Sequence, residues 1–519
     1  MKKTVLLAIT AGLAGILLAG CTAGFEDINR NPNEVTDAQL QVMNYKTGTN
    51  IRTLQSLVVP VEEHLYQFVE SLAAGPFAGY LGATPDGWLT KFETFNPSAD
   101  WNKAPFVDVI AETYPAYRAI MNGTDDEVTR AFASLLRVAI MHRLTDCYGP
   151  IPYSKIIDNT EESLEVAYDS QEEVYDKMFE ELDAVLAVFK ANASLDPSAF
   201  EKYDLVYYGD MTKWYKYANS LKLRMAMRLS YVKPELARQK AEEAVAAGVI
   251  TTNAEGAYLH AAENRMALIY NDWGDHRVAV DLVSYLNGWS DPRREKMILP
   301  AKSNDKYNGI RIGVPYPTSK SSAMNGCSNM IVSADTPYLW MNAAEVAFLR
   351  AEGALRGWDM GDTARNLYEQ GIRLSFAEKG ADGADAYIAD ATSVTEKQFG
   401  SDAQYQSNIT IAWDEGQTEA NLERIIVQKW IAIFPLGMEA WAEHRRTGYP
   451  LLLPVENNLS GGTVDSRYGA RRLTYPSEEY SENSANVEAA VSMLNATSVS
   501  GGGDTMGTRV WWDVKPYND

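Results

Sequence analysis

Residues Pro337–Gly380 read PYLWMNAAEVAFLRAEGALRGWDMGDTARNLYEQGIRLSFAEKG, and this stretch predicts two amphipathic helices joined by a tight turn. Gly361 interrupts the pattern, and Asp362 is a favourable N-cap for the second helix. Apolar or small side chains recur every three or four residues in each half and so share one face of each helix. They are Ala344, Phe348, Ala351, Leu355 and Trp358 in the first helix, and Ala364, Leu367, Tyr368, Gly371, Ile372, Ser375 and Phe376 in the second.

This alanine-rich hairpin resembles a tetratricopeptide unit, which cannot bury its apolar face alone and therefore needs neighbours. Any packed helical hairpin of a large α protein has the same pattern, so both interpretations stay open on this stretch. Similar hairpins recur, at residues 126–190, 211–247, 342–379 and 420–446. The sequence predicts a mainly α fold with about four tetratricopeptide-like hairpins and a large loop-rich insertion region.

The first 21 residues, MKKTVLLAITAGLAGILLAGC, predict a lipoprotein signal. Lys2 and Lys3 precede an apolar run of 14 residues, which is too short to span a bilayer. The ending LAGC matches a bacterial lipobox, in which cleavage precedes the cysteine and its thiol receives a lipid. We therefore expect a signal peptide over 1–20, a lipid anchor on Cys21 and a single domain over 21–519. An ordinary secretory signal is the alternative.

The composition excludes some classes of function. The formal charge is −22, whereas a nucleic-acid-binding surface is basic. The five histidines are scattered without ligand spacing, so we expect no metal and no cofactor. Cys147 and Cys327 can pair in an extracytoplasmic compartment or remain free thiols, because no spacing motif decides between them.

Two irregular segments carry aromatic and polar residues that are candidates for ligand binding. The candidates are Tyr80, Trp88 and Trp101 in segment 75–105, and Asn271, Trp273 and Asp275 in the sequence NRMALIYNDWGDHR. Packing of the same rings onto the core is the alternative interpretation. Trp358, Trp430 and Trp441 fall on helical stripes and are expected in the core.

The sequence lacks the motifs of several enzyme classes: G-x-S-x-G, H-E-x-x-H, G-x-x-x-x-G-K-[ST] and C-x-x-C. We therefore expect a binding protein rather than an enzyme. A glycosidase needs only two carboxylates that the fold brings together, and 69 acidic residues leave that alternative open.

Six segments, in chain order, resemble the SusD/RagB family of outer-membrane nutrient-binding lipoproteins: FEDINRNPNEVT, DCYGPIPYS, SYLNGWSDPR, PYLWMNAAEVAFLRAEGALRGW, RIIVQKWIAIFPLGMEAWAEHRRTGYP and RRLTYPSEEYSENSANVEAA. The resemblance implies an α-rich fold with four tetratricopeptide-like hairpins, anchored by lipid on the outer face of the outer membrane. It implies a SusC-like TonB-dependent transporter as partner, over which such proteins act as a ligand-capturing lid. It transfers no site residue, because ligand sites in the family share no motif.

The resulting prediction is a cell-surface lipoprotein that binds a glycan, or less readily a peptide, and delivers it to the transporter. Aromatic rings match the apolar faces of sugars, while Asn and Asp match their hydroxyl groups. A surface glycoside hydrolase and a helical-repeat scaffold protein are the alternatives.

Overall fold

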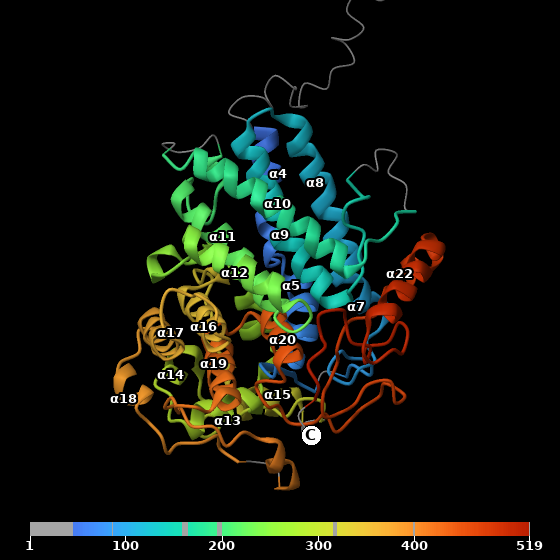
Figure 1. Cartoon of the computed structure of the whole chain (residues 1–519). Coiled ribbons are helices and arrows are strands. Elements are labelled where there is room, and N and C mark those ends of the chain that lie inside the picture. Colours follow the sequence, from blue (N-terminus) through green and yellow to red (C-terminus); the bar gives the residue numbers. More distant parts are fainter. Residues whose placement is uncertain are drawn as a thin grey trace, which may run out of the picture. The chain divides into compact units, whose positions relative to one another are not determined.

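The computed structural model describes residues 45–85, 87–157, 165–194, 200–314, 319–397 and 400–517. The predicted signal peptide and the lipidation site Cys21 lie outside these residues. Thr47–Asp519 form one compact unit, in which helices make up most of the regular structure (Figure 1).

The stretch Pro337–Gly380 contains the predicted pair of helices, α16 (Ala343–Leu355) and α17 (Ala364–Lys379). A short strand, β6 (Tyr338–Met341), precedes them. Trp358, expected in the core, lies beyond the end of α16 and is only half-buried. The remainder of the predicted stripe on α16 is buried up to Ala351 and partly buried at Leu355.

The predicted N-cap of α17 was wrong by one residue. The Thr363 hydroxyl, and not Asp362, accepts the hydrogen bond from the backbone N–H of Asn366, at 3.2 Å. Asp362 accepts instead from the Asn366 side chain at 2.8 Å and from the Thr363 N–H at 2.7 Å. Both residues therefore satisfy polar hydrogens at the start of the helix, which is the function of a cap.

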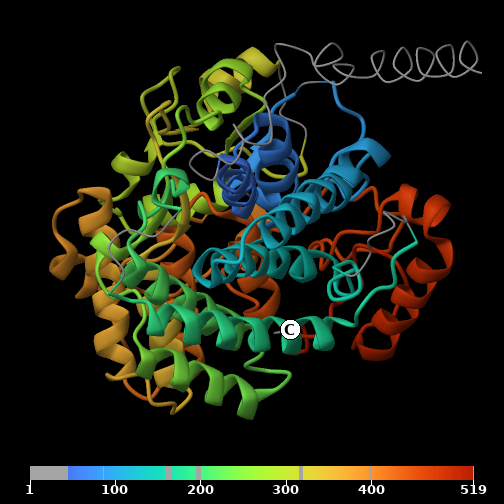
Figure 2. The ribbon, with the colours of Figure 1, turned by 90° about the horizontal axis from the view of Figure 1, so that it is seen from above.

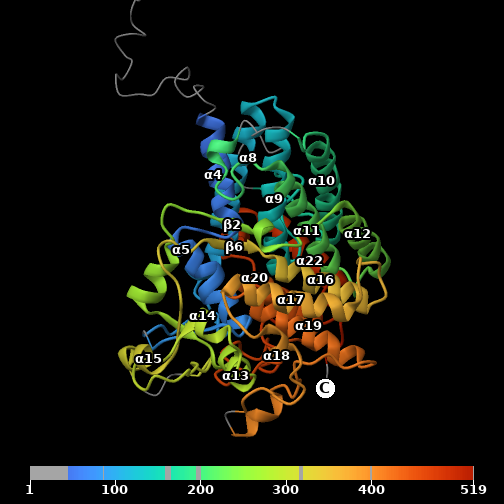
Figure 3. The ribbon, with the colours of Figure 1, turned by 90° about the vertical axis from the view of Figure 1, so that its left-hand side faces the viewer.

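Four helical pairs follow one another along the chain: α9 (Glu127–Tyr148) with α10 (Gln171–Ala191), α11 (Met211–Arg228) with α12 (Pro234–Ala247), α16 with α17, and α19 (Thr418–Ala432) with α20 (Gly437–Thr447). Between pairs, α10 packs on α11, α11 on α16 and α16 on α19. The pairs therefore stack into a column that runs from top to bottom in Figure 3. The predicted mainly α fold with four hairpins is confirmed.

The other elements are short helices and three two-stranded ladders. The remaining helices are α4 (Tyr45–Val58), α7 (Ala99–Lys103), α8 (Val109–Gly123), α13 (Val280–Gly288), α14 (Arg294–Met297), α15 (Lys320–Gly326), α18 (Ala384–Ile388), α21 (Ser477–Glu482) and α22 (Ser484–Thr497). The antiparallel ladders join β1 (Leu81–Ala83) to β3 (His276–Val278), β2 (Ala257–Leu259) to β6, and β4 (Ile298–Leu299) to β5 (Asn329–Met330). Seen from above, α16–α18 (orange) and the C-terminal helices (red) lie on opposite sides (Figure 2).

One further helix positions the candidate site, and we call it the central helix. It consists of α5 (Glu63–Tyr66), a π-helical segment (Gln67–Ala74) and α6 (Gly75–Phe77) without a break. Its buried end packs on α20, where Gly437 approaches so closely that an added Cβ would lie 3.1 Å from the Ala74 carbonyl carbon. This contact fixes the central helix against the last helical pair.

Cys147 and Cys327, which the sequence left open, are both buried and are not joined in a disulfide. Cys147 lies against Met438, with 3.1 Å between the sulfur atoms. Trp430 and Trp441 are fully buried, as their helical stripes predicted.

Candidate functional site

The two irregular segments that carry the candidate residues lie side by side, because β1 pairs with β3. Leu81 lies opposite Val278, and Ala83 lies opposite His276. Beyond the ladder, Thr84 donates from its backbone N–H to the Asp275 carbonyl oxygen at 2.8 Å. Residues almost 200 positions apart in the sequence therefore form one continuous region.

The central helix joins the aromatic side chains of the two segments. The Phe68 ring lies 5.8 Å from that of Trp101, and Trp101 meets Trp88 edge-on at 4.9 Å. On the other segment, the Trp273 ring stacks on His64 at 5.2 Å and 27°. These five side chains, His64, Phe68, Trp88, Trp101 and Trp273, are called the aromatic surface below.

The members of the aromatic surface keep part of their area open to solvent. Trp88, Trp101, Trp273 and Phe68 are half-buried, and His64 is exposed. Next to Trp273, the exposed Asn271 donates to the Val332 carbonyl at 3.1 Å and accepts from Asn329 at 3.3 Å. Rings that are held in place and partly wet, with an amide at their edge, are suited to a ligand that has both apolar and polar faces.

Two of the six candidate residues lie beneath the aromatic surface rather than in it. Tyr80 is fully buried, its ring stacks 5.3 Å from that of Trp430, and its hydroxyl donates to the Trp430 carbonyl. Burial raises the pKa of Tyr80 well above its usual value, so the hydroxyl stays protonated. Asp275 is 9% exposed; it forms an ion pair with Lys320 and accepts from the Gln67 amide at 2.9 Å.

Each of the three π-helical segments among the described residues borders the aromatic surface. Phe68 lies in Gln67–Ala74, Trp273 lies in Leu268–Trp273, and Trp101 lies just before Ala104–Asp108. A π-helical turn inserts an extra residue, which redirects the side chains that follow and is frequent at functional sites. The coincidence of three such segments sets this region apart from the regular helical pairs.

The acidic residues beside the aromatic surface are engaged by protein groups. Arg265 donates to both oxygens of Glu63, at 3.0 and 2.7 Å, and lowers the pKa of Glu63 to about 2. Glu62 caps the central helix by accepting from the Leu65 N–H at 2.7 Å. Glu62, Glu63 and His64 place ligand atoms within 4.8 Å of one another, as a metal site requires, but each already has a structural role. We therefore assign no metal to them.

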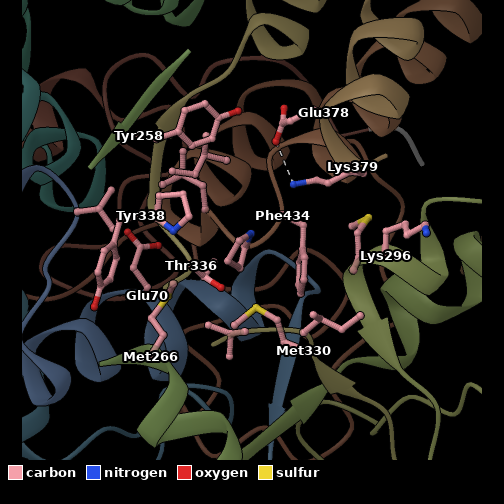
Figure 4. Close-up of a pocket in the computed structure, with 18 of the residues that line it drawn as sticks. Glu70, Tyr258, Met266, Lys296, Met330, Thr336, Tyr338, Glu378, Lys379 and Phe434 are labelled. Atoms are coloured by element: carbon pink, nitrogen blue, oxygen red, sulfur yellow. Dashed lines mark hydrogen bonds and ion pairs between the residues drawn. The ribbon is translucent and has the colours of Figure 1, made fainter. Parts of the chain in front are cut away.

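A cavity of about 570 Å³ lies elsewhere (Figure 4). Tyr66 and Glu70 of the central helix line this cavity, whereas His64 and Phe68 of the same helix contribute to the aromatic surface. The protein thus has a partly open aromatic surface and a separate pocket that share one helix as a wall.

Sequence reasoning missed His64 and Phe68, because they precede the irregular segment 75–105 in which the first group of candidates was found. Aromatic rings at alternate positions, His64, Tyr66 and Phe68, were the available signal. The pocket gave no signal, because its lining comes from segments far apart in the chain.

Comparison with known proteins identifies the family. The family model described as "SusD-like: Susd and RagB outer membrane lipoprotein" matches residues 27–513. A SusD homologue from Bacteroides thetaiotaomicron is 49% identical, with a TM-score of 0.87, covering 91% of this chain and 100% of its own. A homologue from Bacteroides ovatus is 43% identical, with a TM-score of 0.85, covering 91% and 99%. No curated protein matches the sequence significantly.

A third solved structure, described as a chitin-binding SusD homologue from Flavobacterium johnsoniae, is 37% identical with a TM-score of 0.83. It covers 91% of this chain and 100% of its own. The fold is thus that of a helical-repeat protein whose irregular segments form an aromatic surface. The chain belongs to the SusD-like family of outer-membrane lipoproteins. Among the described residues, every helix is too short or too polar to cross a membrane.

Proposed function

We propose that this protein binds a glycan at the aromatic surface, on the outside of the outer membrane, and delivers it to a TonB-dependent transporter. The observation that carries the proposal is that partly exposed tryptophans from two distant segments contact one helix: Trp273 stacks on His64, and Trp101, with Trp88 against it, lies beside Phe68 four residues further on. Flat rings stack on the C–H faces of sugar rings, and Asn271 offers amide groups to hydroxyls. The chitin-binding description of a 37% identical homologue supports a carbohydrate ligand.

Binding without chemical change fits the electrostatics of the surface. Glycoside hydrolysis needs a carboxylic acid that is still protonated at working pH, together with a second carboxylate. Glu63 is held ionised by Arg265, and Asp275 is paired with Lys320. Neither side chain is therefore placed as a proton donor, and we propose that the bound glycan stays intact.

Single substitutions at the aromatic surface test the proposal. In calorimetry against a panel of neutral oligosaccharides, Trp273→Ala and Trp101→Ala should each weaken binding about tenfold or more, because a stacked ring at an interface contributes on the order of 1–2 kcal/mol. Trp358→Ala is the control, since Trp358 is equally half-buried but lies after α16, away from the surface. Unchanged affinity in both surface variants, or release of shortened sugars by the protein, would contradict the proposal.

The transporter partner has its own test. A TonB-dependent barrel should co-purify with the tagged full chain from detergent-solubilised membranes, and bound glycan should change the amount recovered. A preparation in which the protein is recovered without any barrel would argue against delivery while leaving glycan binding intact.

A further inference from the structure

The pocket in Figure 4 is built as a ligand site in its own right. Its floor is buried and largely apolar, and it includes three methionines, Met266, Met297 and Met330, together with Phe434. At 570 Å³ its volume lies within the range of about 300–1,000 Å³ that small-molecule sites occupy. Methionine side chains adapt their shape to an apolar group that enters between them.

The pocket has a mouth on the protein surface. Lys296, Ile331 and Ala377 line the pocket and are solvent-exposed. Ile331 keeps 41% of its area exposed and so offers an apolar contact at the entrance. A small unit can therefore enter from solvent without opening the core.

Three buried polar atoms in the wall have few or no hydrogen-bond partners in the protein. Asn253 Oδ1 has none among the described residues, and the Tyr258 hydroxyl and Glu378 Oε2 have at most each other. Tyr258 and Glu378 lie at the same end of the pocket (Figure 4). Burial raises the pKa of Tyr258, and the charge of Glu378 and a hydrogen bond to it raise the pKa further, so the hydroxyl stays protonated. Buried polar atoms without partners are rare and costly, and a ligand that bonds to them gains that energy.

The charge balance of the pocket favours a neutral ligand. Lys379 donates to Glu378 at 3.1 Å, and Glu70 is paired with Arg143 while accepting from the Met438 N–H at 3.1 Å. Each carboxylate therefore already has a cation beside it. A further ammonium group would meet the Lys379 charge, whereas N–H and O–H groups of an uncharged ligand would not.

From these features we infer that the pocket binds one N-acylated amino-sugar unit, a deduction that rests on the proposed glycan-binding function. The free Asn253 acceptor and the Tyr258–Glu378 pair suit a ligand that carries several N–H and O–H groups and a carbonyl close together. A single N-acetylated sugar ring carries all of these, while a peptide offers only one N–H per residue along its backbone. The acetyl methyl group supplies the apolar contact for the methionines. The pocket then recognises one N-acylated unit of the glycan, and the aromatic surface binds further sugar units of the same chain.

Three disaccharides with the same β-1,4 skeleton test this inference on the full chain. They are di-N-acetylchitobiose, its deacetylated form and cellobiose, which differ only at C2 of each ring. In calorimetry the acetylated disaccharide should bind about tenfold or more tightly than either of the others, as expected for a hydrogen bond and a buried methyl group. Equal affinities, or no binding of di-N-acetylchitobiose, would overturn the inference.

Substitutions test whether the preference for the acetylated disaccharide arises in the pocket. Ala377→Trp blocks the mouth from an exposed helix position, and Tyr258→Phe removes the hydroxyl beside Glu378; both should abolish or reduce the preference for the acetylated sugar. Ala364→Trp, on the same helix but outside the pocket, should leave it unchanged. A preference that survives Ala377→Trp would place acetyl recognition elsewhere and overturn the assignment.

Two further readouts separate this inference from the proposed function. Trp273→Ala should weaken binding of all long glycans yet keep the ratio between acetylated and plain sugars. The methyl resonances of Met266 and Met330 should shift only when di-N-acetylchitobiose is added. Should N-acetyl-leucine amide shift them and the sugar not, the pocket would be a peptide site and the inference would be wrong, while glycan binding at the aromatic surface would be unaffected.

Discussion

Tryptophan side chains in this protein have two roles, which differ in how far the side chains are buried. Trp430 donates to the Ala78 carbonyl at 2.7 Å, Trp441 to the Ala470 carbonyl at 2.9 Å and Trp512 to Asp146 at 2.8 Å, and all three are fully buried. Trp101 and Trp273 contact other rings instead and remain partly exposed. The first group stabilises the core, and the second presents a surface to a ligand.

Asp281 makes the free energy of unfolding depend on pH. It lies near the start of α13, is buried, and accepts from the Leu453 N–H at 2.8 Å. Burial raises its pKa from an ordinary value of 3.8 to about 6. Ionisation is therefore harder in the folded protein than in the unfolded chain, so above pH 6 the ionised form favours unfolding.

Asp281→Asn should accordingly stabilise the protein at pH 7, because the amide oxygen can still accept from Leu453 without carrying a buried charge. The gain in free energy of unfolding should reach up to about 3 kcal/mol above pH 6 and disappear as the pH falls below about 4, where both states of the wild type are protonated. Thermal unfolding from pH 4 to pH 8 measures it. Asp305→Asn, at an exposed position, should show no such trend, and a gain that persists at pH 4 would refute the explanation.

At the scale of the element, the hairpin of α16 and α17 depends on a close approach at Gly371. A Cβ added there would lie 2.6 Å from the buried Phe348 ring. Ala normally favours a helix by about 1 kcal/mol over Gly, whereas overpacking of a core costs about 1–3 kcal/mol. The steric cost should therefore exceed the gain in helix propensity.

We expect Gly371→Ala to lower the melting temperature, and Phe348→Leu to restore part of the loss when both changes are combined. A double-mutant cycle in thermal unfolding measures the coupling between the two residues. Additive effects would show that the ring and the glycine do not constrain each other.

The π-helical segments could not be predicted from the spacing of apolar residues. The spacing of apolar residues along the central helix does not reveal the wider π-helical turns between Gln67 and Ala74. That irregularity depends on contacts with α20 and the neighbouring segments, and spacing along one helix contains no information about them.

At the scale of the whole molecule, a buried ionic network links four helices from three of the pairs. It comprises Arg224 and Arg228 of α11, Glu345 and Glu352 of α16, Lys429 of α19, and Glu439, Glu443 and Arg446 of α20. Arg446 is fully buried, 2.6 Å from Glu352 and 2.7 Å from Glu443. Such charges fix the mutual position of the helices, because any shift would leave one of them unpaired.

Arg446→Met should destabilise the protein by about 3–5 kcal/mol, since it keeps the volume but removes one buried cation that Glu352 and Glu443 share, leaving Glu352 with Arg356 and Glu443 with Lys429 and Arg228. Arg365→Met is the matched control: Arg365 pairs with Glu369 and Glu415 on the exposed face of α17, where water replaces the lost contacts. Chemical denaturation compares the two variants. Similar stability of both would mean that the network adds nothing to the alignment of the pairs.

The sequence by itself determined the four helical pairs, because the spacing of apolar residues sets which face of a helix is buried whatever its neighbours are. It also predicted the burial of Trp430 and Trp441, and it singled out the two irregular segments that lie together in the fold. Only the tertiary structure separated Tyr80, a core residue, from Trp101 and Trp273 at the surface, and added His64 and Phe68 to them. Exposure and cavity shape arise from contacts between residues hundreds of positions apart, as in the Asn253–Tyr258–Glu378 pocket, and no local pattern encodes them.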